Sequence, residues 1–295
     1  MSSQSSDNTN RSFRDKWYHN EKLAFDQTLR EGTQIHQWIL ERNGFASDAE
    51  FKDYLYHKHR ILDAGCGNGR VTALLREYSP PTALVVGIDS VAAEVARRNL
   101  MRYGNVEVRQ GDLLDDLSGL GRFDFIYCQE VLHHTRDPSR AFQNLSTLLE
   151  PGGEIAIYVY KKKAVAREFA DDYVRSRIAD LSYEDAMAVC REITELGRAL
   201  WESDQRIKVP QVKVMGIEAG EYELQRFVYH FFMKCFWNPE LSYEENVAIN
   251  YDWYHPQLAS RHTLSEVEGW FRDADLRVTH RCVDFYGITM RGIRR

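Results

Sequence analysis

The chain has 295 residues, 43% hydrophobic and 12% aromatic, which is enough for one sizeable core or for a core domain with a smaller appended one. Its 38 Lys and Arg against 44 Asp and Glu give a net charge of −6, whereas proteins that bind nucleic-acid backbones usually carry a basic excess. The five cysteines include no C-x-x-C pair, which argues against a disulfide framework or a zinc site and suits a reducing cytoplasm. No apolar stretch is long enough to span a bilayer. We therefore expect a cytoplasmic protein without a membrane partner, a nucleic-acid partner or a metal.

The N-terminal residues are predicted to precede the main fold. Residues 1–10 are rich in Ser, Asn and Gln and lack the pattern of a signal peptide, so we expect a short disordered tail. Residues 11–58 carry apolar side chains at helical spacing and are expected to form a helical cap. Within this cap, Gly44 is expected to end one helix, and Ser47 followed by Glu50 has the spacing of a capping box that begins another.

Strand-like and helix-like segments alternate over residues 59–160. The expected strands are Arg60–Ala64, Ala83–Ile88, Val106–Gln110, Phe123–Cys128 and Glu154–Tyr158. The expected helices between them are Arg70–Glu77, Val91–Met101 and Asp137–Leu149. Strands that alternate with helices at this spacing predict right-handed crossovers and a parallel sheet.

Residues 161–260 break this alternation. Helices are expected to begin after Ser182 and Ser242, because each is followed by acidic residues at helix-capping spacing. The stretch Tyr222–Trp237 is dense in aromatic side chains, which we expect to form the interior of this segment. We interpret residues 161–260 as a helical substrate lid inserted after the fifth strand.

The alternation returns over residues 261–295, where Thr263 has capping-box spacing and begins a helix to about Ala274. Two strand-like runs, Leu276–Val283 and Tyr286–Arg291, are expected to close a hairpin. The predicted fold class is therefore α/β, with a doubly wound, mostly parallel, seven-stranded Rossmann-like sheet that ends in a reversed hairpin. Residues 59–160 and 261–295 would form this core.

A glycine-rich run, Leu62-Asp63-Ala64-Gly65-Cys66-Gly67-Asn68-Gly69-Arg70, follows the first expected strand and opens a helix. Open α/β sheets bind their ligands at this position. Dinucleotide sites prefer G-x-G-x-x-G, because a pyrophosphate must reach the helix N-terminus. Here the glycines alternate, and Asp63 precedes them, which would oppose a pyrophosphate and suit a ligand with an ammonium group. A surface loop that merely contains glycines is the alternative.

Two further acidic residues follow the second and third expected strands. Asp89, with Ser90 beside it, lies 20 residues after Gly69, the offset at which an acid accepts from ribose hydroxyls. Asp112 could accept from an adenine amine while Leu113 packs on the ring. Taken singly, each acid could instead be a solvated strand-end residue.

These motifs together resemble the class I S-adenosylmethionine-dependent methyltransferases over Arg60 to Leu149, and the turn Leu149–Gly153 matches as well. The resemblance implies S-adenosyl-L-methionine as cofactor, with the glycine loop at its methionine portion, Asp89 at the ribose and Gln129 near the methionyl end. We also expect Trp17 to close over the cofactor or, equally, to pack the first helix. The predicted cofactor residues are Trp17, Asp63, Gly65, Cys66, Gly67, Asp89, Ser90, Asp112, Leu113 and Gln129.

The resemblance further implies methyl transfer to a small soluble acceptor. His133 and His134 follow the fourth strand, where one imidazole could act as general base, or the residues could be structural. Lys161 begins a run of three lysines that could receive an anionic group, although a solvated helix start is the alternative. The predicted acceptor residues are Tyr160, Lys161, Tyr251, Trp253, Tyr254 and His255, of which the last four could instead form a packed hinge.

Three rival functions stay open at this point. The same cofactor could support a non-methylating reaction, such as cyclisation or transfer of another group. A nicotinamide-dependent oxidoreductase is disfavoured by the alternating glycines and by Asp63. A non-catalytic subunit could keep the fold. Base methylation is disfavoured because the fourth strand ends in Cys128-Gln129-Glu130, not in the Asn/Asp-Pro-Pro-aromatic run of enzymes that methylate exocyclic amines.

Overall fold

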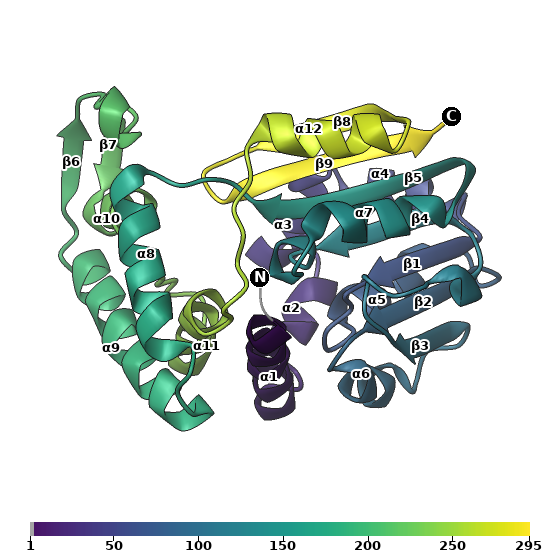
Figure 1. Cartoon of the computed structure of the whole chain (residues 1–295), viewed down its shortest axis with the longest axis horizontal. Coiled ribbons are helices and arrows are strands. Elements are labelled where there is room, and N and C mark those ends of the chain that lie inside the picture. The colour runs from purple at the N-terminus through teal and green to yellow at the C-terminus, as the bar shows by residue number, and fades with distance from the viewer. Residues whose placement is uncertain (1–2) are drawn as a thin grey trace. The chain divides into compact units, whose positions relative to one another are not determined.

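A computed structural model describes residues 3–295, which form two compact units. The α/β unit comprises Trp17–Lys161 and Ser260–Arg295, so the chain leaves it once and returns. The helical unit comprises the residues up to Lys16 together with Lys162–Ala259. Figure 1 labels the elements of both units. No helix within residues 3–295 is long and apolar enough to cross a membrane.

The α/β unit is built on a seven-stranded sheet of order β3-β2-β1-β4-β5-β9-β8, visible in Figure 1. The strands are β1 (Arg60–Ala64), β2 (Leu84–Asp89), β3 (Val106–Gln110), β4 (Phe123–Gln129), β5 (Leu149–Tyr160), β8 (Leu276–Val283) and β9 (Gly287–Arg294). The first five pair in parallel, whereas β9 runs antiparallel to both β5 and β8. The predicted fold class, including its reversed hairpin, is confirmed.

Several helices of this unit begin at a local capping signal. Ser47, Asp137 and Thr263 each accept a hydrogen bond from a backbone amide three residues on and so act as N-caps. For Ser47 and Thr263 the capping-box spacing predicts this role. The helices are α2 (Phe25–Leu29), α3 (Gln34–Arg42), α4 (Asp48–Tyr56), α5 (Arg70–Tyr78), α6 (Ala93–Leu100), α7 (Pro138–Thr147) and α12 (Leu264–Asp273). Helix α1 (Ser3–His19) runs across the boundary between the units.

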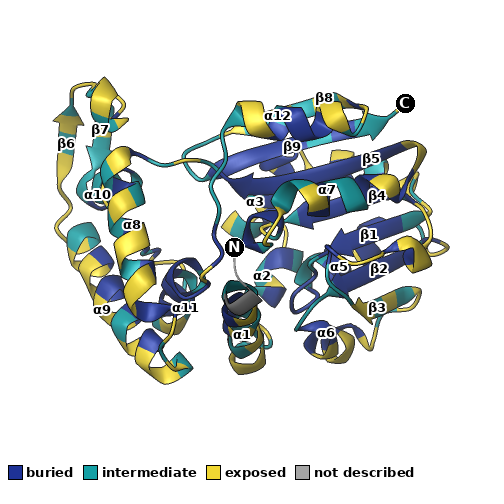
Figure 2. Ribbon diagram, in the orientation of Figure 1, coloured by how far each residue is buried: buried dark blue, intermediate teal, exposed yellow. Residues whose placement is uncertain are grey.

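The central strands are buried on both faces, as Figure 2 shows for β1, β4 and β5. On one face Leu62, Ile126 and Ile157 pack with α7 and α12, and on the other Ile61, Phe125 and Ala156 pack with α3, α4 and α5. Continuous apolar runs of this kind are typical of parallel sheets covered by helices. The sheet is therefore a rigid base for the loops at its C-terminal edge.

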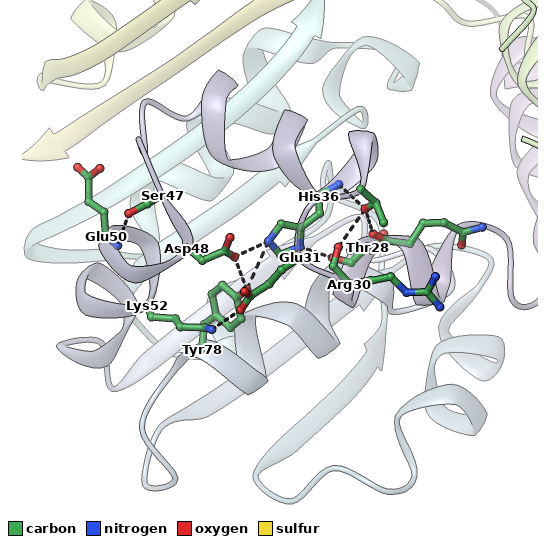
Figure 3. Close-up of polar contacts among 11 residues, drawn as sticks. Thr28, Arg30, Glu31, His36, Ser47, Asp48, Glu50, Lys52 and Tyr78 are labelled. Atoms are coloured by element: carbon green, nitrogen blue, oxygen red, sulfur yellow. Dashed lines mark hydrogen bonds and ion pairs between the residues drawn. The ribbon is translucent and has the colours of Figure 1, made fainter. Parts of the chain in front are cut away.

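A buried polar cluster joins the N-terminal helices to the sheet-covering helix α5 (Figure 3). The His36 imidazole has no exposed surface; its Nδ1 lies 2.8 Å from the Thr28 carbonyl and its Nε2 lies 2.5 Å from Asp48 Oδ1. The Tyr78 hydroxyl donates to the same Asp48 oxygen at 2.5 Å. Since these residues come from α2, α3, α4 and α5, the cluster fixes four helices against one another.

The helical unit contains α8 (Val165–Ile178), α9 (Tyr183–Glu202), α10 (Leu224–Phe231) and α11 (Tyr243–Tyr254). Ser182 and Ser242 cap α9 and α11, as predicted. A two-stranded hairpin of β6 (Arg206–Val209) and β7 (Gly220–Glu223) was not predicted, because strands of only 4 residues each give a weak sequence signal. The role of residues 161–260 as a substrate lid stays a prediction.

The structure differs from the expectation of a disordered tail over residues 1–10; residues 1 and 2 lie outside the described residues. Residues 3–10 belong to α1, and the side chains of Asn8 and Thr9 are buried in the helical unit. Asn8 accepts from the Gln257 amide at 3.1 Å, and Thr9 accepts from the Leu258 amide at 2.9 Å. Polar side chains that suggest disorder by their composition instead form hydrogen bonds with backbone groups far along the chain.

Candidate functional site

The loop between β1 and α5 turns on three glycines in the left-handed region. The φ angles of Gly65, Gly67 and Gly69 are 81°, 55° and 86°, a conformation that residues with a Cβ rarely adopt. The amides of Gly65 and Cys66 both donate to the Ile88 carbonyl, at 2.8 and 3.0 Å. The loop therefore lies at the C-terminal ends of β1 and β2, the ligand-binding edge of open α/β sheets.

Two of these glycines also lie against large side chains. A Cβ on Gly67 would be 2.8 Å from the indole of Trp17, and a Cβ on Gly65 would be 2.2 Å from a methyl group of Val131. The loop thus needs glycine for close packing as well as for its backbone angles. Trp17, a predicted cofactor residue, lies directly against the loop.

Asp63 and Cys66 are buried parts of the predicted cofactor site. Asp63 is 3% exposed and accepts a hydrogen bond from the Thr72 hydroxyl at 2.6 Å. Burial raises the pKa of the Asp63 carboxyl to about 6, against the opposing effects of this hydrogen bond and of Arg70. Burial also raises the pKa of the Cys66 thiol, as do the nearby charges of Asp89 and Asp63. Asp63 is therefore a buried titratable carboxyl, and Cys66 a neutral side chain.

Asp89, at the end of β2, links the glycine loop to α6. Its Oδ2 accepts from the Gly67 amide at 2.9 Å, and its Oδ1 accepts from the amides of Val91 and Ala92 at 2.9 and 2.8 Å. A carboxylate offers about four lone-pair positions, so capacity for a further donor is left on Oδ2. Because the residue is only half-buried, a ribose hydroxyl is a donor that could use this position.

The predicted adenine residues continue from Asp89 along the same edge. The Gly111 amide donates to the Asp89 carbonyl at 3.1 Å. Asp112, the residue after Gly111, therefore follows Asp89 along this edge of the sheet. One Asp112 oxygen accepts from the backbone amide two residues on, and the side chain stays half-exposed. Leu113 is 5% exposed and packs mainly into the hydrophobic core, whereas Ser90 is half-exposed.

The end of β4 carries Gln129 and a strained residue. The Tyr127 hydroxyl donates to the Gln129 side-chain oxygen. Glu130 follows with φ 61°, which is uncommon for a residue with a side chain, and its carboxylate lies 4.0 Å from Arg70 Nη2. Backbone strain of this kind is concentrated at ligand sites. Sequence inspection gives no signal for it, because Glu is not a typical left-handed residue.

His133 and His134 belong to a ring cluster beside the end of β5. The His133 ring is fully buried, with its centroid 3.7 Å from that of Tyr160 and 4.3 Å from that of His134. His134 is 9% exposed. The His133 carbonyl accepts from the Ser260 amide at 2.9 Å, which ties this segment to the returning chain. Both rings are therefore buried, and only His134 keeps a small exposed surface.

The six predicted acceptor residues are divided between the two units. Tyr160 and Lys161 follow one another at the end of β5, in the α/β unit, where Tyr160 is buried and Lys161 half-buried. The other four lie in the helical unit, in α11 and at its C-cap: Tyr251, Trp253, Tyr254 and His255.

The four aromatic residues of the helical unit are all at most 3% exposed. Trp253 Nε1 and the Tyr254 hydroxyl donate to Asp171 at 2.9 and 2.8 Å. The His255 Nδ1 lies 2.8 Å from the Ser12 hydroxyl. Trp253, Tyr254 and His255 thus make their hydrogen bonds inside the unit, as the packed-hinge alternative expects. The buried Tyr251 hydroxyl, in contrast, has no hydrogen-bond partner among the described residues.

Two asparagines of the site were not predicted. Asn68 Nδ2 donates to the carbonyls of Glu21 and Leu23, both at 3.1 Å, and Asn99 Nδ2 donates to the carbonyls of Glu21 and Asn68, both at 2.9 Å. They fasten the segment after Trp17 to the glycine loop. The position of Asn68 between two loop glycines was a sequence signal that could have identified it. The sequence around Asn99 contains no such signal.

A family model matches this part of the chain. The model of a family described as "Methyltransferase domain" matches residues 56–206, just over half of the chain. The matched segment begins before β1 and includes β1 to β5, the glycine loop, Asp89 and the β4 end.

Among curated proteins, the trans-aconitate 2-methyltransferase of Deinococcus radiodurans is 34% identical over 43% of this chain and 47% of its own length. A ubiquinone biosynthesis O-methyltransferase of Coxiella burnetii is 33% identical over 33% of this chain and 42% of its own. This chain spans less than half the length of these relatives. Among solved structures, magnesium protoporphyrin IX methyltransferase from Synechocystis PCC 6803 is 14% identical, with a TM-score of 0.43 and coverage of 93% of this chain and 100% of that chain.

Proposed function

Because this chain belongs to the family of methyltransferase domains, we propose that it transfers the methyl group of S-adenosyl-L-methionine to a small organic acceptor. Family membership confirms the resemblance to class I methyltransferases, the enzyme class and the cofactor expected from the sequence. The activity of the protein on a particular acceptor, and the anionic character of that acceptor, are proposals. The two named relatives support a small-molecule acceptor, since their names refer to trans-aconitate and to ubiquinone biosynthesis.

The observation that carries the proposal is the arrangement at the C-terminal edge of the sheet. Three left-handed glycines cross the ends of β1 and β2, and the acid at the end of β2 keeps capacity for a hydroxyl donor. These residues fit S-adenosyl-L-methionine, because the loop lets its backbone approach the ligand and its acids suit a cationic group and a ribose. We assign the methionine portion to Gly65 and Gly67, the ribose to Asp89, and the adenine to Asp112 and Leu113.

The remaining predicted residues have supporting roles in this proposal. Trp17 would cover the loop and hold a cation over its indole face. Gln129, oriented by the Tyr127 hydroxyl, would lie near the methionyl end. Asp63 would stabilise the ammonium group from its buried position, and Cys66 and Ser90 would contribute backbone contacts.

The bound cofactor supplies an electrophilic methyl group on a sulfonium, so the chain's own residues need chiefly to align the acceptor and exclude water. Where the acceptor must lose a proton, His134 would hold it, since His134 retains some exposure beside the end of β4. Tyr160 packs against His133 and would fix the orientation of the histidine pair.

Calorimetric titration with S-adenosylmethionine, S-adenosylhomocysteine and NAD tests the proposal directly. Wild-type protein should bind the first two, and Asp89→Ala should bind them roughly ten- to a hundredfold more weakly, because a charge-assisted contact to the ribose is lost. Glu107→Ala, which removes an exposed acid on the neighbouring strand β3, is the matched control and should bind as wild type does. Binding of NAD alone, or of none of the three, would overturn the proposal.

A further inference from the structure

Arg42, the last residue of α3, has a side chain that is only 8% exposed although its charge is permanent. Three aromatic rings surround the guanidinium: its Cζ lies 4.9 Å from the ring centroids of Trp38 and Tyr158 and 5.4 Å from that of Tyr286. Rings around a guanidinium restrict further partners to its edge, where its N–H groups point. Arg42 is therefore a cation in a narrow aromatic enclosure.

One side of this guanidinium is already occupied by a fixed carboxylate. Arg42 Nε lies 3.3 Å from Asp284 Oδ2. The other oxygen of Asp284 accepts from the amides of Tyr286 and Gly287, both at 2.7 Å, so the turn before β9 holds the carboxylate in place. The described residues provide no hydrogen-bond acceptor for the two terminal nitrogens of Arg42. The N–H groups on the two terminal nitrogens of Arg42 therefore remain as hydrogen-bond donors for a ligand.

These donors lie beside the end of β4, which the proposed function places near the methionyl end of the cofactor. Tyr158, which faces Arg42, pairs in register with Gln129 at the end of β4. Burial lowers the pKa of the Arg42 guanidinium, but the charges of Tyr158, Asp284 and Glu130 outweigh burial and raise it. Glu130, which follows Gln129, is therefore close enough to Arg42 to act on its charge. Lys161 adds a second cation at this edge, with its Nζ 5.9 Å from the ring centroid of Phe285.

We propose that Arg42, assisted by Lys161, is the specificity-determining residue that binds a carboxylate group of the acceptor. A guanidinium edge with two parallel donors matches a carboxylate bidentately. A doubly charged phosphate fits less well, because Asp284 already neutralises part of the charge and Glu130 would repel it. This inference rests on the proposed methyltransferase function, since it names the acceptor class of the same site.

The test uses full-length protein saturated with S-adenosylhomocysteine, so that failure of cofactor binding is seen first and counts against the proposed function alone. Benzoate, 4-hydroxybenzoate and hexanoate are each titrated by calorimetry against the corresponding amide, and phenyl phosphate is included. At least one carboxylate should bind tenfold or more tightly than its amide. Arg42→Gln should abolish this preference, and Arg42→Lys should keep part of it.

Arg60→Gln is the matched control. Arg60 also places a guanidinium near an aromatic ring, 5.1 Å from Phe123, but its donors are used by backbone carbonyls at the opposite edge of the sheet. This variant should keep the preference for the carboxylate. If Arg42→Gln does not fold, Lys161→Gln at the half-buried neighbouring position should weaken the preference several-fold. No preference in wild type, tighter binding of phenyl phosphate than of every carboxylate, or an equal loss in Arg60→Gln would overturn the proposal.

Discussion

Two carboxylates, one in each unit, show how differently the units use polar groups. Asp171 in the helical unit is fully buried and accepts four hydrogen bonds: from the Lys234 amide and the Tyr254 hydroxyl on Oδ1, and from Arg167 Nε and Trp253 Nε1 on Oδ2. Asp89 in the α/β unit is half-buried and accepts three backbone amides. Asp171 is therefore saturated, whereas Asp89 has capacity left for a ligand.

For these two carboxylates, unfilled hydrogen-bonding capacity distinguishes the candidate ligand-binding group from the structural one, whereas residue type does not. Tyr254 and Trp253 are residue types that are common in ligand pockets, yet their polar atoms donate hydrogen bonds to Asp171. Asp89 and Arg42 keep donors or acceptors available at the ligand-binding edge of the sheet. The predictions below test this distinction, from the largest expected effect to the smallest.

Removing Asp171 should destabilise the protein most. Asp171→Ala leaves the Arg167 guanidinium buried and unpaired, which should lower the free energy of unfolding by about 3–5 kcal/mol. Urea unfolding followed by circular dichroism measures this loss. Asp172→Ala is the matched control on the next residue of α8; its side chain is 54% exposed and its ion pair with Arg175 should contribute about 1 kcal/mol or less. A loss no larger than that of the control would contradict the structural role of Asp171.

Asp63 should make stability depend on pH. The pKa of Asp63 in the folded protein is about 6, higher than the usual value of about 3.9 for an unfolded aspartate. Protonation of Asp63 therefore stabilises the folded protein. This stabilisation is complete below about pH 3.9 and is lost as the pH rises through about 6. The loss should amount to about 3 kcal/mol at most between pH 4 and pH 7. Unfolding of wild type and Asp63→Asn at a series of pH values should show the dependence only in wild type. The same slope in both proteins would assign the effect to another group.

The α/β unit could be predicted closely because its signals are local. A glycine loop after an apolar strand, an N-cap before Pro138 and the capping box at Thr263 each involve residues close together in the sequence. Such patterns fix element type and order, and order in a doubly wound sheet fixes which loops meet at one edge. The strand Arg60–Ala64 was predicted with its observed bounds, while Glu154–Tyr158 extends back to Leu149 because Leu149 pairs with Phe123.

The remaining features depend on partners far apart in the chain. Asp171 bonds to Trp253 and Tyr254 across 82 and 83 residues, so no local pattern reveals whether those aromatic groups face a ligand or a core. Arg42 was missed for the same reason, because its enclosure combines α3, β5 and the turn before β9. Residues 1–10 were judged by composition, whereas the burial of Asn8 and Thr9 depends on backbone groups at residues 257 and 258.

Replacing His134 should separate catalysis from cofactor binding. If His134 holds the acceptor's proton, His134→Gln should lower turnover about a hundredfold, the lower end of the usual range for general base catalysis, and leave the affinity for S-adenosylhomocysteine unchanged. Turnover is measured on the acceptor found by screening, with calorimetry for the affinity. His57→Gln, whose side chain is 72% exposed after α4, should match wild type in both. Unchanged turnover in His134→Gln would mean that alignment alone drives the reaction.

Asp48 is half-buried, as Asp89 is, and its replacement should have the smallest effect. Its side chain is 28% exposed, and burial, which raises its pKa, is outweighed by the hydrogen bonds from Tyr78 and His36, which lower it (Figure 3). The stabilisation from the ionised Asp48 is therefore present above the unfolded pKa, about 3.9, and is lost as pH falls through the lower folded pKa.

Wild type should lose more stability than Asp48→Asn between pH 5 and pH 2.5, measured by thermal unfolding. Asp53→Asn, on the same helix with an 83% exposed side chain, should behave as wild type. An equal loss in Asp48→Asn and wild type would show that partial exposure already screens the cluster, so that only fully buried carboxylates such as Asp171 stabilise this fold through their hydrogen bonds.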